Sequence, residues 1–350
     1  MKSKAGDPIA MFNQKMEEEI RKMRRPTILV AGYTGAGKTS LIQAICGKNV
    51  VPDNRIGEGL PKTDSFDFYE SNVVRFFDSK GLEAGENEKR FIEEAKQFVR
   101  SLQDNSNVDN HIHLVWYTVQ GPGARVTSCD LRLIKEIFPN VLVLITKNDI
   151  TRKNQRDAME KVLIDGGIPQ GKILSCAEND IESLTKVVQL SYDILPEAYR
   201  DAFQDAQMID FGSKHNKAHA IIHGASVAAA AAGAVPIPIS DALIITPIQF
   251  GMIASLALIY NEPQEALKVA FGPAIAEVVG VLAATSLSKL IPGLGSAINA
   301  TVAAALTEAL GWIVQSLLKE RSIARIKGTP VPELRIDLGE LRKAYERIKK

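Results

Sequence analysis

One glycine-rich segment constrains this chain more than any other part of its sequence. Gly32-Tyr33-Thr34-Gly35-Ala36-Gly37-Lys38-Thr39 matches the pattern G-x-x-x-x-G-K-[ST] at every fixed position. The apolar run Thr27–Ala31 before it predicts a buried strand, and Ser40–Ile45 after it predicts the first turns of a helix. A strand, a glycine-rich loop and a helix in this order predict a phosphate-binding loop.

The residue types of this loop suit a polyphosphate ligand. Glycines let the backbone come close to phosphate oxygens, and the helix N-terminus adds the positive end of its dipole. We expect the Lys38 ammonium to reach the β- and γ-phosphates and the Thr39 hydroxyl to bind Mg²⁺. The predicted nucleotide-binding residues of this segment are Gly32, Tyr33, Thr34, Gly35, Ala36, Gly37, Lys38, Thr39 and Ser40.

A second predicted strand ends in an acidic residue. Val73–Phe77 runs into Asp78-Ser79-Lys80-Gly81, a D-x-x-G pattern. We expect Asp78 to hold Mg²⁺ through a water molecule and the Gly81 N–H to meet the γ-phosphate. The pattern is short and common by chance, so its weight comes from its place after a strand.

A third predicted strand, Val141–Ile145, leads into a pattern that reads guanine. The segment Thr146-Lys147-Asn148-Asp149 fits [NT]-K-x-D. The Asp149 carboxylate can accept hydrogen bonds from both N1–H and the 2-amino group of guanine, which adenine cannot offer. The Lys147 stem can lie over the base. The sequence therefore predicts a guanine nucleotide, GTP or GDP, as the ligand.

The last motif follows the short predicted strand Lys172-Ile173-Leu174. Ser175-Cys176-Ala177 predicts a loop whose backbone N–H meets guanine O6. All four motifs follow apolar runs, and ligand sites at the carboxyl ends of parallel strands are typical of doubly wound sheets. We predict an α/β P-loop domain with a mostly parallel sheet and helices on both faces.

The region from Arg25 to Pro196 resembles translation-factor-class GTPases and is closest in style to the Era/TrmE-like group and to the immunity-related and septin-like GTPases. The form of its glycine-rich loop is similar to the form common in the immunity-related branch. The resemblance implies Mg²⁺-dependent GTP hydrolysis and a switch threonine, for which Thr63 is the candidate that would close the Mg²⁺ shell. Lys38, Thr63 and Gly81 are the catalytic candidates, and Thr39, Thr63 and Asp78 are the metal candidates.

Two positions depart from the wider GTPase pattern. Leu82 stands where Ras-like enzymes carry a water-orienting glutamine, so intrinsic hydrolysis should be slow unless another group assists. That group could come from a partner, from a second copy across the nucleotide or from the backbone, and we expect self-association through the GTPase domain as a dimer. Gly35 replaces the asparagine that holds potassium in the TrmE-like branch.

The composition of the chain limits the kinds of partner and compartment that we expect for it. The chain has 350 residues and a formal charge of +1, which gives no bulk electrostatic case for nucleic acid. Cys46, Cys129 and Cys176 lack metal-ligand spacing and fit a reducing compartment. With a polar N-terminus, this predicts a cytoplasmic protein or one at the cytoplasmic face of a membrane.

The sequence predicts four parts along the chain. They are an amphipathic helix in 1–24, the GTPase domain in 25–196, an all-α, Ala/Gly-rich helical domain in 197–329 and a tail helix in 330–350.

The second half of the chain leaves two alternatives open. Ala242–Tyr260 is long enough to cross a bilayer, and small residues would allow close helix contacts. A stripe from Val302 to Leu317 instead favours an amphipathic helix of a soluble bundle. Through Ala234–Ala242 and Thr246–Gln249 this half resembles a bacterial YcjF-like domain of unknown function.

Two helical segments carry similar choices. The helix in Ala10–Met23 could pack on the protein or bind a membrane or partner. His215, His219 and His223 share a helical face and could bind a metal, but polar or capping roles are favoured. Together the motifs predict a GTP-hydrolysing switch read by a helical, membrane-associated domain. The alternative is a slow, soluble switch that recruits partners.

Overall fold

The computed structural model describes residues 8–47, 66–79, 88–123, 125–233, 242–262, 300–327, 329–334, 336 and 338–348. Contacts divide the chain into two units. Met23–Asp210 forms one unit, and the other combines Met1–Lys22 with Phe211–Lys350. The first unit is called the α/β unit below and the second the helical unit.

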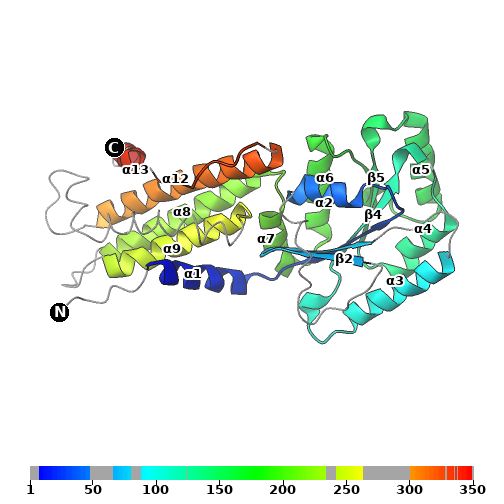
Figure 1. Ribbon diagram of the computed structural model, residues 1–350, viewed down its shortest axis with the longest axis horizontal. Helices are drawn as coiled ribbons and strands as arrows, with labels where there is room; N and C mark the ends of the chain where they lie inside the picture. Colours follow the sequence, from blue (N-terminus) through cyan, green and yellow to red (C-terminus); the bar gives the residue numbers. More distant parts are fainter. Residues whose placement is uncertain are drawn as a thin grey trace. The chain divides into compact units, whose positions relative to one another are not determined.

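The α/β unit is built on a six-stranded sheet with the order β2-β3-β1-β4-β5-β6. Only the β2–β3 pair is antiparallel, and the other four pairings are parallel, which confirms the predicted fold class. Figure 1 shows the strands with helices around them. The strands are β1 (Thr27–Gly32), β2 (Phe66–Glu70), β3 (Arg75–Ser79), β4 (Leu114–Gln120), β5 (Val141–Thr146) and β6 (Ile173–Ser175).

Helices cover both faces of this sheet because alternate strand residues point to opposite sides. Tyr117 joins a buried cluster with Phe98 of α3 and Met159 of α5. Its neighbour Trp116 faces the other side, where its indole N–H donates to Ser191 of α6 at 2.9 Å. The helices of this unit are α2 (Lys38–Cys46), α3 (Glu88–Gln103), α4 (Ser128–Arg132), α5 (Lys153–Asp165), α6 (Ile181–Ile194) and α7 (Glu197–Ala206).

The α/β unit ends later than the change in composition after Pro196. Helix α7 belongs to it because aromatic residues of α7 pack on the sheet and the loop before β4. The Tyr199 ring lies 3.8 Å from the His113 ring, and the Phe203 ring lies 6.4 Å from Trp116. The contacts therefore place the boundary after Asp210, whereas composition alone suggested residue 196.

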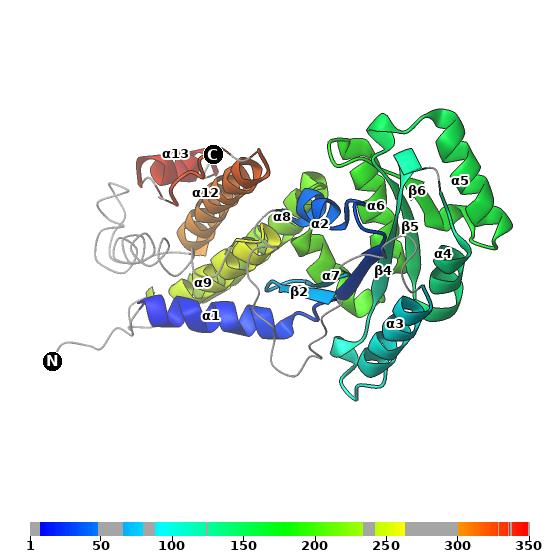
Figure 2. The same ribbon diagram turned by 45° about the vertical axis from the view of Figure 1, so that its right-hand side comes forward.

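The helical unit contains α1 (Pro8–Lys22), α8 (Phe211–Gly233), α9 (Ala242–Ile259), α12 (Ala300–Lys327) and α13 (Leu338–Ile348). Figure 2 shows α1 lying along α9, where Phe12 meets Phe250 edge-on at 6.1 Å. Helices α8, α9 and α12 meet at Gly311. A Cβ there would lie within 3.0 Å of Ile222 and Met252, so only glycine permits this approach.

Polar side chains cross-link the interior of this bundle. Gln249 Nε2 donates to Thr307 Oγ1 at 3.2 Å, and Gln315 Nε2 donates to the Tyr260 hydroxyl at 2.6 Å. Glu262 accepts from both Arg321 and Arg325, and all three side chains are buried. The interior that the structure describes is therefore partly polar. These contacts pair most of its polar groups, but Glu262 Oε2 and Arg325 Nη1 are buried without a hydrogen-bond partner among the described residues.

Helix α12 is buried on most of its circumference. Among the described residues it is the one helix long and apolar enough, by length and composition, to cross a membrane. However, 61% of its apolar window is buried inside the structure, as in the core helix of a soluble protein. The predicted stripe holds for Val302, Leu306 and Leu310, but Val314 and Leu318 take the buried places expected for Ile313 and Leu317.

The histidine face of α8 is exposed. The His215 and His219 rings lie 5.6 and 5.5 Å from Trp312 of α12. No group of three metal-ligating side chains occurs in the part of the chain that the structure describes. The polar or capping role favoured from the sequence stays a prediction.

Candidate functional site

The glycine-rich segment forms the predicted loop between β1 and α2. Gly35 and Gly37 have φ values of +79° and +77°, a region that side chains with a Cβ rarely adopt. Gly37 is the N-cap of α2 and offers no side-chain cap. The first N–H groups of α2 are therefore left for another acceptor, which is the arrangement that binds phosphate.

Lys38 is held over this loop by two backbone carbonyl groups. Its Nζ donates to the Gly32 and Tyr33 carbonyl oxygens at 3.3 and 3.1 Å, and the residue is 8% exposed. Burial lowers the pKa of Lys38, while the nearby Asp78 carboxylate acts in the opposite direction. A negatively charged phosphate oxygen would be a stronger hydrogen-bond acceptor for this buried ammonium group than a backbone carbonyl oxygen is.

Two predicted metal ligands lie side by side. Parallel pairing of Val30 with Asp78 brings the end of β3 beside the start of the loop. The Thr39 hydroxyl donates to Asp78 Oδ2 at 2.5 Å, and Asp78 Oδ1 is buried without a partner among the described residues. Burial raises the pKa of Asp78, against the Thr39 hydrogen bond and the Lys38 charge. An orphaned carboxylate oxygen beside a hydroxyl fits Mg²⁺, which prefers oxygen ligands.

The guanine-reading loop is bonded to the phosphate loop. Thr146 Oγ1 donates to the Ala36 carbonyl at 2.8 Å, so the end of β5 holds the glycine-rich loop in place. Lys147 follows with a φ of +56° and turns the chain into the short helix Asn148–Ile150, which presents Asp149 at the surface.

The third loop joins the same assembly through backbone hydrogen bonds. Cys176 N donates to Ile145 O at 2.8 Å, and Asn148 N donates to Cys176 O at 3.1 Å. The Ala177 N–H donates to Ser183 Oγ at 3.3 Å, and Ser175 Oγ lies 3.3 Å from Glu160. Burial raises the pKa of the Cys176 thiol to about 12, so Cys176 is a packing residue here.

These loops enclose one cavity of about 250 Å³. It brings together residues from the first, third and fourth motifs. The lining residues are Gly37, Ser40, Leu41, Thr146, Lys147, Asp149, Ile150, Cys176 and Glu178. Thr63, Lys80, Gly81 and Leu82 lie outside the described residues, so their roles stay predictions.

Sequence reasoning missed a support behind the loop. The Tyr33 hydroxyl lies 3.2 Å from Thr127 Oγ1, and Thr127 forms a capping box with Asp130 at the start of α4. Tyr117 O–H donates to Asp130 Oδ1 at 2.5 Å in the sheet interior. The pattern Thr127-x-x-Asp130 is a capping-box signature and could have revealed this helix start.

Comparisons with known proteins agree with this geometry. Residues 27–163 match the protein-family model described as 50S ribosome-binding GTPase. The chain contains a P-loop GTPase domain. The match covers β1 to α5, with the phosphate loop, Asp78 and the guanine-reading loop inside it.

Two curated proteins are similar to somewhat less than half of the chain. Cell division control protein 11 of Encephalitozoon cuniculi is 24% identical over 206 residues, which cover 49% of this chain and 74% of that protein. Septin-2 of Rattus norvegicus is 24% identical over 179 residues, which cover 44% of this chain and 49% of that protein. The chain thus spans about half the length of Septin-2.

Solved structures similar to the chain are 17–18% identical to it in sequence over the part that they match. A probable GTP-binding protein engB covers 48% of this chain, over 97% of its own length, with a TM-score of 0.38. A dimerization-deficient mutant of Toc33 from Arabidopsis thaliana covers 49% of this chain, over 78% of its own length, with a TM-score of 0.31. Toc33 in complex with Mg²⁺ and GMPPNP covers 51%, over 80% of its own length, with a TM-score of 0.30. The Era/TrmE-like, immunity-related and YcjF-like assignments stay predictions.

Proposed function

We propose that this protein is a Mg²⁺-dependent GTP-binding and GTP-hydrolysing switch. The observation that supports this proposal most directly is the Thr39–Asp78 pair. One carboxylate oxygen of Asp78 has no partner among the described residues, and the buried Lys38 ammonium lies nearby. Bound Mg²⁺ would neutralise charge on the phosphates and orient them. Lys38 and the loop N–H groups stabilise phosphate charge, and Asp149 with Lys147 selects guanine.

In this proposal Thr63 and Gly81 sense the γ-phosphate and Leu82 leaves hydrolysis slow. A second copy of the chain supplies the missing group across the nucleotide, and Arg125 is our candidate. Arg125 is exposed, follows β4 at the carboxyl edge of the sheet and has no ion pair or hydrogen bond with the described residues. Thr127, two residues on, contacts Tyr33 of the phosphate loop, so the segment that carries Arg125 runs beside this loop. An arginine supplied to the transition state can speed hydrolysis by roughly 10³–10⁵-fold.

The helical unit reads the nucleotide state in this proposal, at the cytoplasmic face of a membrane or in the cytoplasm. The polar interior of the bundle favours a unit that packs on itself and recruits partners without inserting. If the helices of this unit separated and inserted into a bilayer, they would lose the Gln249–Thr307 hydrogen bond and the Glu262–Arg321 ion pair. Three buried free cysteines agree with a reducing compartment.

Liposome flotation with GDP and with GMPPNP tests the membrane part. The self-packed alternative predicts protein at the bottom of the gradient in both states, without detergent. Flotation in GMPPNP alone would support a lipid-facing effector instead. Phosphate release measured at rising protein concentration tests the catalytic part, because assistance by a second copy makes turnover per molecule rise with concentration.

A further inference from the structure

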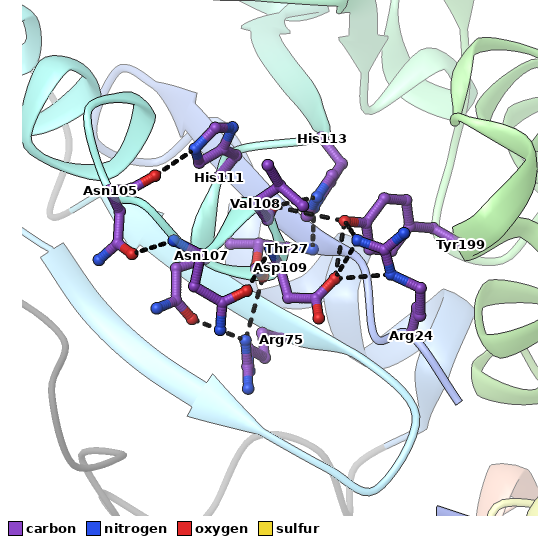
Figure 3. A network of polar contacts seen from close by, with 11 residues as sticks. Arg24, Thr27, Arg75, Asn105, Asn107, Val108, Asp109, His111, His113 and Tyr199 are labelled. Atoms are coloured by element: carbon purple, nitrogen blue, oxygen red, sulfur yellow. Dashed lines mark hydrogen bonds and ion pairs between the residues drawn. The ribbon is translucent and has the colours of Figure 1, made fainter. Parts of the chain in front are cut away.

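A network of polar contacts lies at the amino ends of β1, β3 and β4, whereas the nucleotide site lies at their carboxyl ends (Figure 3). Its centre is formed by Arg24, Asp109, His113 and Tyr199, which we call the base clamp. The four residues come from the start of the α/β unit, the loop before β4 and helix α7. None of the four motifs accounts for them.

Asp109 is the centre of the base clamp. Its Oδ1 accepts from Arg24 Nε and from the Tyr199 hydroxyl, both at 2.8 Å. Arg24 also places its guanidinium 4.8 Å from the centre of the Tyr199 ring. Burial alone would raise the pKa of Asp109, but hydrogen bonds from Tyr199 and Arg24 outweigh it and lower the pKa. Arg24, Asp109 and Tyr199 therefore form a closed triangle of contacts.

His113 fixes this triangle to the sheet. Its Nδ1 accepts from the Thr27 backbone N–H at 2.9 Å, and its Nε2 lies 3.1 Å from the Val108 carbonyl. This arrangement requires the neutral ring with its proton on Nε2. The His113 ring lies against the Tyr199 ring, with 3.8 Å between the ring centres and 39° between the ring planes. The first residue of β1 and helix α7 are thus held by one imidazole.

The chain passes between its two units at two places, Lys22–Met23 and Asp210–Phe211. Arg24 comes directly after the first crossing. Tyr199 lies on α7, the last helix before the second crossing. The Arg24–Tyr199 contact therefore joins the two segments that lead to the helical unit, inside the α/β unit itself.

The β2–β3 hairpin connects the base clamp to the end of the sheet that carries the nucleotide site. Arg75, the first residue of β3, donates to the Asp109 carbonyl at 3.1 Å and to Glu70 of β2 at 2.9 Å. At the other end of the hairpin, β3 carries Asp78 and β2 begins three residues after Thr63. A shift of this hairpin along its axis would move Arg75 and with it the backbone of Asp109.

We infer that the base clamp passes the nucleotide state from the β2–β3 hairpin to the two chain segments that lead into the helical unit. This inference rests on the proposed GTP switch and names its relay. The Arg24 and Asp109 side chains are 43% and 36% exposed, so their ion pair is screened and contributes little net stability. Rearranging this ion pair would therefore cost little free energy, as a relay between two states requires.

Hydrogen–deuterium exchange of the full chain, compared between GDP and GMPPNP, tests the relay. In the wild type, exchange of peptides from α8 and α12 should differ between the two nucleotides. Asp109→Asn removes the charge without changing shape, and Tyr199→Phe removes the hydroxyl but keeps the ring on His113. Both variants should lose the difference in α8 and α12 while binding GMPPNP within about twofold of wild type, since the site is distant.

Tyr192→Phe is the matched control, because Tyr192 pairs with Arg200 at 5.2 Å outside the base clamp. This variant should keep the wild-type difference. A difference that survives in both base-clamp variants would overturn the relay and leave the GTP switch standing. A wild type that binds GMPPNP but shows no difference would overturn the relay and the reading role of the helical unit. A wild type that binds no nucleotide would overturn the proposed function itself, and the relay with it.

Discussion

The Thr39 hydroxyl lies 2.5 Å from the Asp78 carboxylate, although 39 residues separate them in the sequence. The contact exists because β1 and β3 pair in parallel, which brings the end of one strand beside the loop after the other. The second Asp78 oxygen is buried without a partner among the described residues. This pair is the most direct structural support for the proposed magnesium site.

Asp78→Asn should weaken magnesium-dependent binding without destabilising the empty protein. Burial raises the pKa of Asp78 above its usual value, so its charge opposes folding of the apo protein at neutral pH. That opposition weakens as pH falls toward the folded-state pKa. We expect the apo variant to melt at the wild-type temperature or above, while Mg²⁺ no longer strengthens GTP binding. A lower melting temperature together with intact Mg²⁺ dependence would refute this role.

Asp149→Asn should exchange guanine for xanthine preference. The amide cannot accept from both N1–H and the 2-amino group, but it can donate to the second oxygen of xanthine. A lost bidentate contact of this kind costs about 1–3 kcal/mol, roughly 5- to 150-fold in affinity. Competition between GDP and XDP for a fluorescent nucleotide measures the exchange. XDP binding by the variant is its own folding control, and unchanged GDP preference would contradict the assignment.

His113 should make the protein sensitive to mild acid. Burial lowers the pKa of His113 from 6.5 to about 4, so the unfolded chain binds more protons than the folded one between these values. Stability is therefore lost as pH falls below 6.5, by about 2 kcal/mol between pH 7 and pH 5 at about 1.36 kcal/mol per pKa unit. Urea unfolding at the two pH values measures this loss. His113→Gln should show a smaller loss, and an equal loss would assign the acid sensitivity to other groups.

Arg125→Ala should remove the concentration dependence of GTP turnover if a second copy supplies Arg125. The side chain is exposed and has no hydrogen bond or ion pair with the described residues, so its loss should leave stability and GTP affinity unchanged. Arg132→Ala is the matched control on the nearby helix α4, where Arg132 pairs with Glu136 on the surface. Concentration-dependent turnover that persists in Arg125→Ala would contradict this role.

The strands of the GTPase domain that lead directly into a nucleotide-binding motif could be predicted from the sequence. Strand β1 was expected at Thr27–Ala31 and β5 at Val141–Ile145, each within one residue of the observed end. Both lead into motifs, and the motif marks where the strand must stop. Strands β2 and β4 carry no such motif, so they were not anticipated even though β4 lies in the centre of the sheet.

The base clamp could not be predicted because tertiary contacts alone create it. Arg24 and Tyr199 are 175 residues apart, and Tyr199 lies beyond the change in composition after Pro196. Burial of charge in α12 was missed for a similar reason. No sequence motif marks Arg321 or Arg325, and only the structure shows that Glu262 pairs with both inside the bundle.

Equilibrium binding of a fluorescent GTP analogue to the full chain, with unlabelled GTP and ATP as competitors, tests the central claim most directly. The account predicts that GTP competes, that ATP does not, and that removing Mg²⁺ weakens binding. It also predicts that Lys38→Ala lowers affinity by about 10- to 100-fold, because a charge-assisted hydrogen bond to phosphate contributes about 1.5–3 kcal/mol. Equal competition by ATP, or affinity unaffected by Lys38→Ala, would contradict the account.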